Sequence, residues 1–227
     1  MADFINTLDV LGDDAVIDSI IDRSITEFKD DTLTMVGLRA FVECKSLKTV
    51  DLPNVTTLGE SAFSWCTALE TVDLPNVTSV AQYAFHRCAI SNNISMAKVT
   101  SLPYQCFGYA TIAKAVFPKL VVIEGQAFRY SSTVTILDLP VCTEIGGANF
   151  HDGSSCTHLI LRTNNVCTIG GLNAGIRNVY VPSALIEDYK VATNWASLYA
   201  SNSDLFRALE DYTVDGTITG ELDETKI

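Results

Sequence analysis

The stretch VTTLGESAFSWCTALETVDLPN, residues 55–76, decides the fold because the chain repeats it. The following 22 residues, VTSVAQYAFHRCAISNNISMAK (77–98), keep the same markers in register. An Ala-Phe pair recurs at steps of 22 and a cysteine follows each pair: Ala40-Phe41 with Cys44, Ala62-Phe63 with Cys66, Ala84-Phe85 with Cys88. Later copies are degenerate, with Phe107, Phe128 and Phe150 in the Phe slot and one residue missing before Phe117. Self-similarity at a fixed period indicates a repeat architecture.

Each copy predicts two short strands and a turn. Residues 49–52 alternate polar and apolar side chains, which is typical of a strand with one buried face, and Pro53 ends that strand. A second short strand would point Val55 and Leu58 inward, and the AF-x-x-C segment would then turn the chain back with its ring and thiol in the core. A unit of this size cannot bury its apolar face alone, so neighbouring copies must stack. The sequence predicts a repeat solenoid of mainly short β-strands, with a little helix at its caps.

We expect the solenoid to cover residues 25–182 in about seven repeats of 21–22 residues, beginning with a strand near Phe28. Residues 1–24 would form an N-terminal cap, in which Asp13 or Asp14 begins a short helix. Residues 183–227 would form a C-terminal cap and an acidic tail.

Within the C-terminal region, Ser183 would cap a helix that runs through Tyr189. Trp195 and Leu198 would then plug the last rung, and residues 204–212 would add a short helix or strand. The segment from residue 215 onward is acidic and rich in Gly and Thr, which leaves open a flexible end, a shortened linker or an assembly strand.

These residues resemble the BspA-like branch of the leucine-rich repeats, whose units carry an AF-x-x-C segment and an L-x-x-V-x-L-P strand. The resemblance covers roughly residues 25–182, and YVPSALIEDYKVATNW (180–195) is similar to the cap that often closes such arrays. IIDRSITEF (20–28) and DYTVDGTITGEL (211–222) resemble phage-associated members. Family members are mostly bacterial surface adhesins and host-contact proteins, and similar arrays occur in phage tail proteins. The resemblance therefore implies a binding protein and no cofactor.

Charge is concentrated at the two ends of the chain. The net charge is −12, yet residues 32–182 hold nine acids and ten bases, so the middle is close to neutral. Nothing resembles a basic track for nucleic acid, and no apolar run reaches the roughly 18 residues that a membrane span needs. The start of the chain, MADF, lacks the basic residues of a secretory signal. We expect neither nucleic-acid binding nor membrane insertion, and the oligomeric state stays open.

The cysteines and histidines do not suggest a metal or catalytic site. The seven cysteines contain no C-x-x-C pair, so we expect buried, reduced thiols that act as small apolar side chains. His86 and His151 follow the Phe of the repeat and His158 aligns with Thr49, so all three are expected to be solvated. No acid or nucleophile recurs beside them, which argues against an enzyme. The pairs at 146–147 and 170–171 are interpreted as turn glycines, not as a phosphate loop.

One candidate contact surface is the outward strand face, which is found by aligning each copy to Thr49 and Asp51. Early copies carry polar residues there, but later copies carry an apolar strip: Val116, Ile136, Ile160 and Tyr180. Apolar patches on a solvated face usually mark contacts. The alternative is that the C-terminal segment folds back over the strip.

A second candidate is the turn between Phe and Cys in successive copies. It carries aromatic and cationic residues, namely Trp65, His86, Arg87, Tyr109, Arg129 and Tyr130, with His151 beyond them. Such residues are enriched at interface hot spots, and exposed rings also stack on sugars. The alternative is ordinary variation at unconstrained turn positions.

Together these observations predict a non-enzymatic binding or structural module whose partner is a protein or a surface glycan. The leading hypothesis is a phage or prophage virion component, a tail or fibre module that contacts a bacterial surface or another virion protein. The alternatives are a bacterial cell-surface adhesin whose signal peptide has been removed, and a purely structural assembly protein. The expected location is accordingly the virion, or else the bacterial surface.

Overall fold

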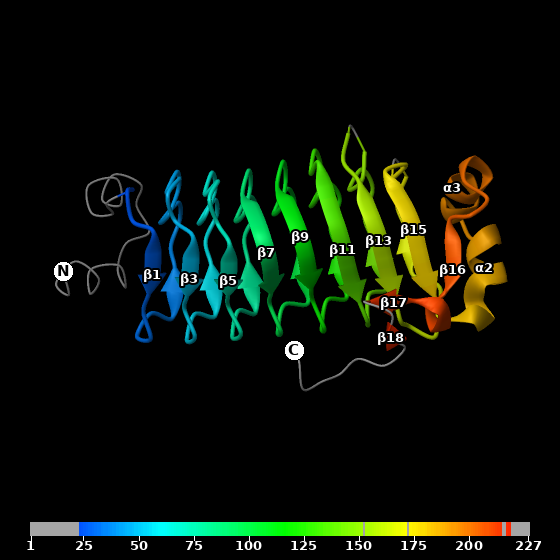
Figure 1. Cartoon of the computed structure of the whole chain (residues 1–227), viewed down its shortest axis with the longest axis horizontal. Coiled ribbons are helices and arrows are strands. Elements are labelled where there is room, and N and C mark those ends of the chain that lie inside the picture. The colour runs from blue at the N-terminus through cyan, green and yellow to red at the C-terminus, as the bar shows by residue number, and fades with distance from the viewer. Residues whose placement is uncertain (1–22, 152, 172, 215–216, 219–227) are drawn as a thin grey trace.

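The computed structural model describes residues 23–151, 153–171, 173–214 and 217–218. The alternating segments of the repeats stack into one nine-stranded parallel sheet that runs along the long axis of the molecule (Figure 1). Its strands, in spatial order, are β1 (Glu27–Lys29), β3 (Thr49–Asp51), β5 (Thr71–Asp73), β7 (Ala89–Ser95), β9 (Thr111–Val116), β11 (Thr133–Leu139), β13 (Cys156–Leu161), β15 (Ile176–Val181) and β16 (Phe206–Ala208). The predicted solenoid is confirmed, including a first strand near Phe28, which pairs with Val50.

Two-residue strands form a second wall. They are β2 (Met35–Val36), β4 (Thr57–Leu58), β6 (Ser79–Val80), β8 (Ser101–Leu102), β10 (Val122–Ile123), β12 (Glu144–Ile145) and β14 (Thr168–Ile169). They pair in parallel as a three-stranded sheet, β2-β4-β6, and a four-stranded sheet, β8-β10-β12-β14. Each buries its second residue, as predicted for Leu58.

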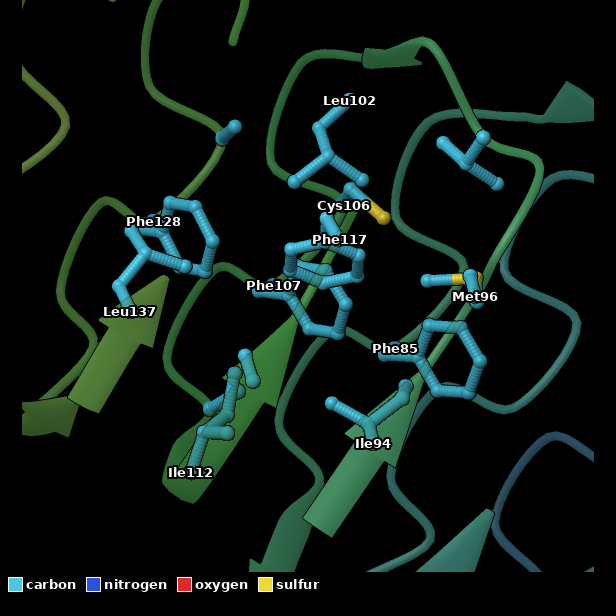
Figure 2. Close-up of a cluster of buried hydrophobic side chains, with 14 of the residues drawn as sticks. Phe85, Ile94, Met96, Leu102, Cys106, Phe107, Ile112, Phe117, Phe128 and Leu137 are labelled. Atoms are coloured by element: carbon cyan, nitrogen blue, oxygen red, sulfur yellow. The ribbon is translucent and has the colours of Figure 1, made fainter. Parts of the chain in front are cut away.

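The core lies between the two walls and is built from equivalent side chains of successive repeats. Phe41, Phe63, Phe85, Phe107, Phe128 and Phe150 are fully buried and stack with ring centroids 5.0 to 5.6 Å apart. Figure 2 shows the middle of this column, with Ile94, Ile112 and Leu137 beside the rings. Burying one such ring stabilises the fold by roughly 1.5–3 kcal/mol, so the stacked column carries much of the stability.

The turn that holds each Phe is itself a hydrogen-bonded ladder. The N–H of Phe41 donates to the carbonyl of Ala62 (2.7 Å), and the N–H of Phe63 donates to that of Ala84 (2.8 Å). The same bond joins Phe85 to the carbonyl of Cys106 (2.8 Å). Buried backbone groups need partners, and here the next repeat supplies them. The repeats therefore bond to one another at the turns as well as along the strands.

The glycines at 146–147 and 170–171 lie between strands, as predicted, and the first glycine of each pair packs unusually close to the preceding rung. A Cβ on Gly146 would stand 2.4 Å from the backbone nitrogen of Gly125, and a Cβ on Gly170 would stand 2.3 Å from that of Gly147. Neither position can accept a side chain without moving backbone. These pairs are part of the stack and do not form a phosphate loop.

The spacing of the repeats is less even than predicted. Between β7 and β9 the pairing changes from Ile90–Ile112 to Asn93–Lys114. The repeat that contains β9 is one residue shorter, and a bulge in β7 accommodates the difference. Later, β12 pairs with β14 at an offset of 24 residues (Glu144–Thr168), whereas β13 pairs with β15 at 20 (Cys156–Ile176). The last copy therefore departs from the expected length of 21–22 residues. The chain that leads into β14 is longer than in the copy before it, and the chain from β14 to β15 is correspondingly shorter.

Three short helices close the C-terminal end: η3 (Ser183–Leu185), α2 (Ile186–Val191) and α3 (Trp195–Ser201). Trp195 is fully buried, and its indole N–H donates to the carbonyl of Cys167 (2.6 Å), while the Cys167 N–H donates to the hydroxyl of Tyr189 (2.8 Å). The prediction that Trp195 plugs the last rung is confirmed.

One detail of this cap is corrected. Ser183 makes no capping bond with its side chain; instead its hydroxyl donates to the carboxylate of Glu210 (3.2 Å), and its N–H faces the same group. The segment predicted as helix or strand after residue 204 contains both, since β16 is followed by η4 (Leu209–Asp211). A two-stranded antiparallel pair, β17 (Thr213–Val214) and β18 (Thr217–Ile218), comes next. The predicted N-terminal cap lies outside the described residues, apart from residues 23–24.

Candidate functional site

The turn between Phe and Cys places one residue per repeat in the left-handed region. Five successive repeats contribute Glu43, Trp65, Arg87, Tyr109 and Tyr130, with φ between 57° and 66°. The backbone N–H groups of the first four bond to the following repeat, as from Trp65 to the carbonyl of His86 and from Arg87 to that of Gly108, both at 2.8 Å. Repetition of this turn aligns the five side chains in a column along the solenoid. A non-glycine residue is uncommon in this conformation, so the sequence alone does not predict the left-handed backbone of these turns.

Aromatic and cationic side chains of the column stack on one another. The guanidinium carbon of Arg87 lies 4.5 Å from the centroid of the Trp65 ring and 4.2 Å from that of Tyr109. The ring of Tyr109 in turn stacks on Tyr130, with centroids 4.5 Å apart. Trp65 and Tyr109 each remain 39% exposed. We call this set, Trp65, His86, Arg87, Tyr109, Arg129 and Tyr130, the turn ridge.

The two remaining members of the turn ridge contact this stack. The guanidinium of Arg129 lies 4.7 Å from the Tyr130 ring centroid and donates to the Tyr130 hydroxyl (2.9 Å) and to Gln126 (2.9 Å). His86 packs edge-on against Tyr109, at 5.3 Å between centroids. The structure therefore brings together six of the seven residues that the sequence placed on this surface, all but His151.

His86 is not the solvated histidine that the sequence predicted. It lies between the rings of Tyr83 (5.5 Å) and Tyr109 and is half-buried. Burial, together with the charge of Arg87, lowers the pKa of His86 to about 4. The side chain is thus neutral at physiological pH. His151 is likewise partly buried and has contacts of its own.

Strand register places the predicted apolar strip on one face of the large sheet. Val116, Ile160 and Tyr180 belong to one row, which also includes Asp138, and Ile136 lies in the neighbouring row. The alignment made from the sequence thus groups the correct residues. Their exposure, however, is not what an open contact face requires.

The C-terminal segment covers the distal part of the strip. Residues 209–212, which we call the C-terminal strap, fold back over the strand face beyond β16 (Figure 1). Leu209 and Tyr212 are buried against Ile160, which is only 1% exposed, and Tyr180 meets Tyr212 with ring centroids 4.7 Å apart. Ile160 is therefore covered by the chain itself and is not open to a partner, which corrects its placement on a free surface. Val116 keeps partial exposure.

A charged pair stands beside the C-terminal strap. Arg162 binds the carboxylate of Asp138 with two hydrogen bonds of 3.0 and 2.9 Å, and the side chains are only 11% and 14% exposed. Burial raises the pKa of Tyr212, and the Asp138 carboxylate acts in the same direction. This arrangement keeps an acid on a nearly dry face by supplying a bidentate partner.

His158 also departs from the sequence prediction. Its ring stacks on Tyr180 (5.9 Å) and lies 6.2 Å from the ring of Tyr212, so the C-terminal strap shields it from solvent. Its Nδ1 is buried and has no hydrogen-bond partner among the described residues. Neither His86 nor His158 is gathered with a nucleophile and an acid in the described part of the chain.

The seven cysteines are all buried, and none of them forms a disulfide within the described part of the chain, which confirms their predicted place in the core. The thiol of Cys66 donates to the carbonyl of Phe41 (3.1 Å), and that of Cys88 donates to the carbonyl of Phe63 (3.0 Å). Ser131, in the equivalent slot, does the same toward Phe107 (2.6 Å). Burial raises the pKa of Cys88 to about 12, so this thiol stays protonated and unreactive. The slot takes a small side chain, Ala110 included, and where it holds Cys66, Cys88 or Ser131 that side chain donates to a backbone carbonyl.

Sequence reasoning missed a pair of buried asparagines. Asn149 takes the Ala slot, and its side-chain oxygen accepts the N–H of Phe128 (3.1 Å) in place of a backbone carbonyl. Asn173 repeats the device by accepting the N–H groups of Asn149 and Phe150 (2.9 and 3.0 Å). An Asn where the repeat has Ala was the available signal. Its role is structural, because the side chains continue the turn ladder where the backbone changes course.

The comparisons with known proteins agree with this architecture. A model described as the BspA-type leucine-rich repeat region matches six copies over residues 22–135, half of the chain. The chain belongs to the BspA-type leucine-rich-repeat family. The resemblance seen in the sequence is thereby confirmed, and the family indicates a repeat protein that works through protein–protein contacts.

A search of curated proteins finds no match for this family member. Among solved structures, it is similar to a leucine-rich repeat protein from Bacteroides ovatus ATCC 8483, at 16% identity and a TM-score of 0.30. The match covers 70% of this chain and 56% of that one, so the chain spans little more than half the length of that protein.

Across the described ranges, no group of three or more His, Cys, Asp or Glu side chains is placed to hold a metal ion. In the same part of the chain, no helix combines the length and the apolar character that a membrane crossing requires. The turn ridge remains the surface with the most distinctive chemistry.

Proposed function

We propose that the protein is a non-enzymatic binding module whose turn ridge docks a macromolecular partner. The observation that carries the proposal is the continuous stack from Trp65 through Arg87 and Tyr109 to Tyr130, which keeps Trp65 and Tyr109 substantially exposed. Aromatic and Arg side chains dominate binding energy at interfaces, and stacking holds these in place before a partner arrives.

The two candidate surfaces contribute unequally to this function. The distal strand face is closed by the C-terminal strap, whereas the turn ridge is open along several repeats. On the strand face, Val116 and Ile136 are contact candidates of secondary importance, since both are only partly exposed.

The experiment is a pulldown with whole bacteria and with candidate partner proteins. A triple variant, Trp65→Ala, Tyr109→Ala and Tyr130→Ala, should fold normally and bind at least ten-fold more weakly, because each ring removed is a potential hot spot. The matched control changes three exposed apolar residues away from the turn ridge, Met35→Ala, Val121→Ala and Val141→Ala, and should bind as the parent does. Unchanged binding by the ridge variant would sink the proposal.

The finer version is that the module is a phage or prophage virion component of a tail or fibre, located in the virion. It is supported by the resemblance of residues 20–28 and 211–222 to phage-associated members. The rival version is a bacterial cell-surface adhesin, and a purely structural assembly role is the third. Neighbouring genes for capsid and tail proteins would support the virion role. A signal peptide and a wall anchor in the native gene would support the adhesin instead.

A further inference from the structure

Arg87 occupies an unusual environment within the turn ridge. Trp65 and Tyr109 come from the repeats on either side of it, so their rings cover both faces of the guanidinium. The hydrogen-bond donors of a guanidinium lie in its plane and point outward from its rim, and stacking leaves them available. Among the described residues no carboxylate or carbonyl oxygen accepts a hydrogen bond from the Arg87 side chain, and none of the ion pairs there includes it.

We infer that Arg87 is a binding site for the carboxylates of an acidic polypeptide segment. The inference rests on the proposed function of the turn ridge and names the chemistry of its partner. A planar guanidinium accepts a carboxylate through two parallel hydrogen bonds along one edge. Because the two rings already hold the guanidinium, little side-chain entropy remains to be lost when the anion binds.

The charge around Arg87 favours an anion. Lys45 Nζ stands 6.0 Å from the centroid of the Trp65 ring, and Arg129 lies against Tyr130 two repeats beyond Arg87. His86, which precedes Arg87 in the chain, is neutral at physiological pH because its pKa is lowered. Glu43, one repeat before Trp65, is paired with Lys45 and Arg23. The turn ridge is thus a cationic and aromatic line on a protein whose net charge is −12.

Ring geometry favours a polypeptide over a sugar. Carbohydrates stack on exposed ring faces, but one face of Tyr109 meets Arg87 and the other meets Tyr130. The near face of Trp65 is likewise taken by Arg87. A partner therefore meets ring edges and the donors on the rim of the guanidinium, which suit the carboxylates of Asp and Glu.

The test uses fluorescence anisotropy of a labelled hexaglutamate peptide with the full chain at low salt, and hexaglutamine as the uncharged comparison. Hexaglutamate should bind and hexaglutamine should not. Arg87→Met keeps the length and much of the stacking of the side chain but removes its donors, and it should weaken binding about ten-fold. Arg87→Lys keeps the charge without the planar fork and should weaken binding less. Lys119→Ala, an exposed cation outside the turn ridge, is the matched control and should have no effect.

Two results would overturn the inference: hexaglutamate binding that Arg87→Met leaves unchanged, or no binding to the parent protein. Tighter binding of an oligogalacturonate than of hexaglutamate would overturn the choice of a polypeptide. The whole-cell pulldown separates this inference from the proposed function. If the triple ring variant loses binding while Arg87→Met keeps it, the inferred carboxylate-binding role of Arg87 is wrong and the docking function of the turn ridge stands. If both variants bind as the parent does, both ideas fail.

Discussion

The turn ridge and the distal strand face both carry aromatic side chains at the surface of the solenoid but differ in what covers them. On the strand face, Ile160 and Tyr180 lie under Leu209 and Tyr212 of the C-terminal strap. On the turn ridge, Trp65 and Tyr109 stay open, and their ring faces are occupied by neighbours in the column. An apolar strip on an outward strand face here indicates a cover supplied by the same chain. Aromatic residues at successive turns indicate an organised surface that remains accessible.

The largest expected effect comes from breaking the charged pair on the covered face. Arg162→Ala should lower the free energy of unfolding by about 3 kcal/mol, because it leaves the nearly buried Asp138 carboxylate without its bidentate partner. Urea denaturation measures the loss. The double variant Arg162→Met with Asp138→Leu should recover most of the stability, since it removes the charge altogether. If the single and double variants lose the same amount, packing rather than charge holds this face.

The second effect tests the C-terminal strap directly. Tyr212→Ala should cost about 2 kcal/mol, because it removes a buried ring from Tyr180 and His158. Hydrogen exchange at Ile160 should become faster, and binding of a hydrophobic dye should rise as the strip is exposed. Tyr212→Phe keeps the ring contacts and serves as the matched control. Slow exchange at Ile160 in the alanine variant would mean that the strap is not what closes this face.

The same contrast shows how far sequence reasoning reaches. The period of 22, the strand alternation and the AF-x-x-C segment predicted the solenoid, the first strand and the buried thiols, because each depends on local pattern. The ridge residues were grouped correctly for the same reason. The stacking of Arg87 between two rings was not predictable, since it follows from left-handed turns that these residue types rarely adopt.

Long-range contacts account for the remaining errors. The solvated environment predicted for His158 was wrong because Tyr212, more than 50 residues later, covers it. Ser183 failed as a cap because Glu210 binds its hydroxyl. Asn149 was missed because the repeat pattern has Ala at this position, and an Asn whose side-chain oxygen replaces a backbone carbonyl as acceptor departs from that pattern. In each case the partner lies outside the repeat unit in which the pattern was found.

A third prediction concerns the pH response of the turn ridge. The pKa of His86 is about 4 in the folded protein and near 6.5 when unfolded, so the unfolded chain binds more protons between these values. The contribution of His86 to stability is present above pH 6.5 and is lost as the pH falls toward 4. Because His86 is only half-buried, solvent screening reduces the effect to about 1 kcal/mol. His86→Gln should flatten the stability curve in this window. If His86→Gln and the parent protein show the same dependence of stability on pH, the lowered pKa assigned to His86 would be contradicted.

The smallest effect concerns the backbone that supports the turn ridge. Glu43 has a φ of 60° and begins the column, but its side chain is not part of the stack. A left-handed residue with a Cβ costs about 1 kcal/mol, part of which is offset by the greater freedom of unfolded glycine, so Glu43→Gly should stabilise the protein by about 0.5 kcal/mol. Its ion pairs are exposed and contribute little.

Glu43→Ala separates the two contributions, because it removes the charge but keeps the unfavourable conformation, and it should be neutral or slightly destabilising. Glu60→Gly, in the next repeat and without positive φ, should destabilise by a similar amount to the gain at Glu43. A loss at both positions would mean that the hydrogen bonds of the turn hold the left-handed residues without strain. The shape of the turn ridge would then be set by the backbone ladder alone, and ring-removing variants would be expected to leave Arg87 in place. A gain in stability at Glu43 alone would mean instead that the left-handed backbone of the column costs free energy, and that the Trp65–Arg87–Tyr109 stack helps to maintain this conformation in successive repeats.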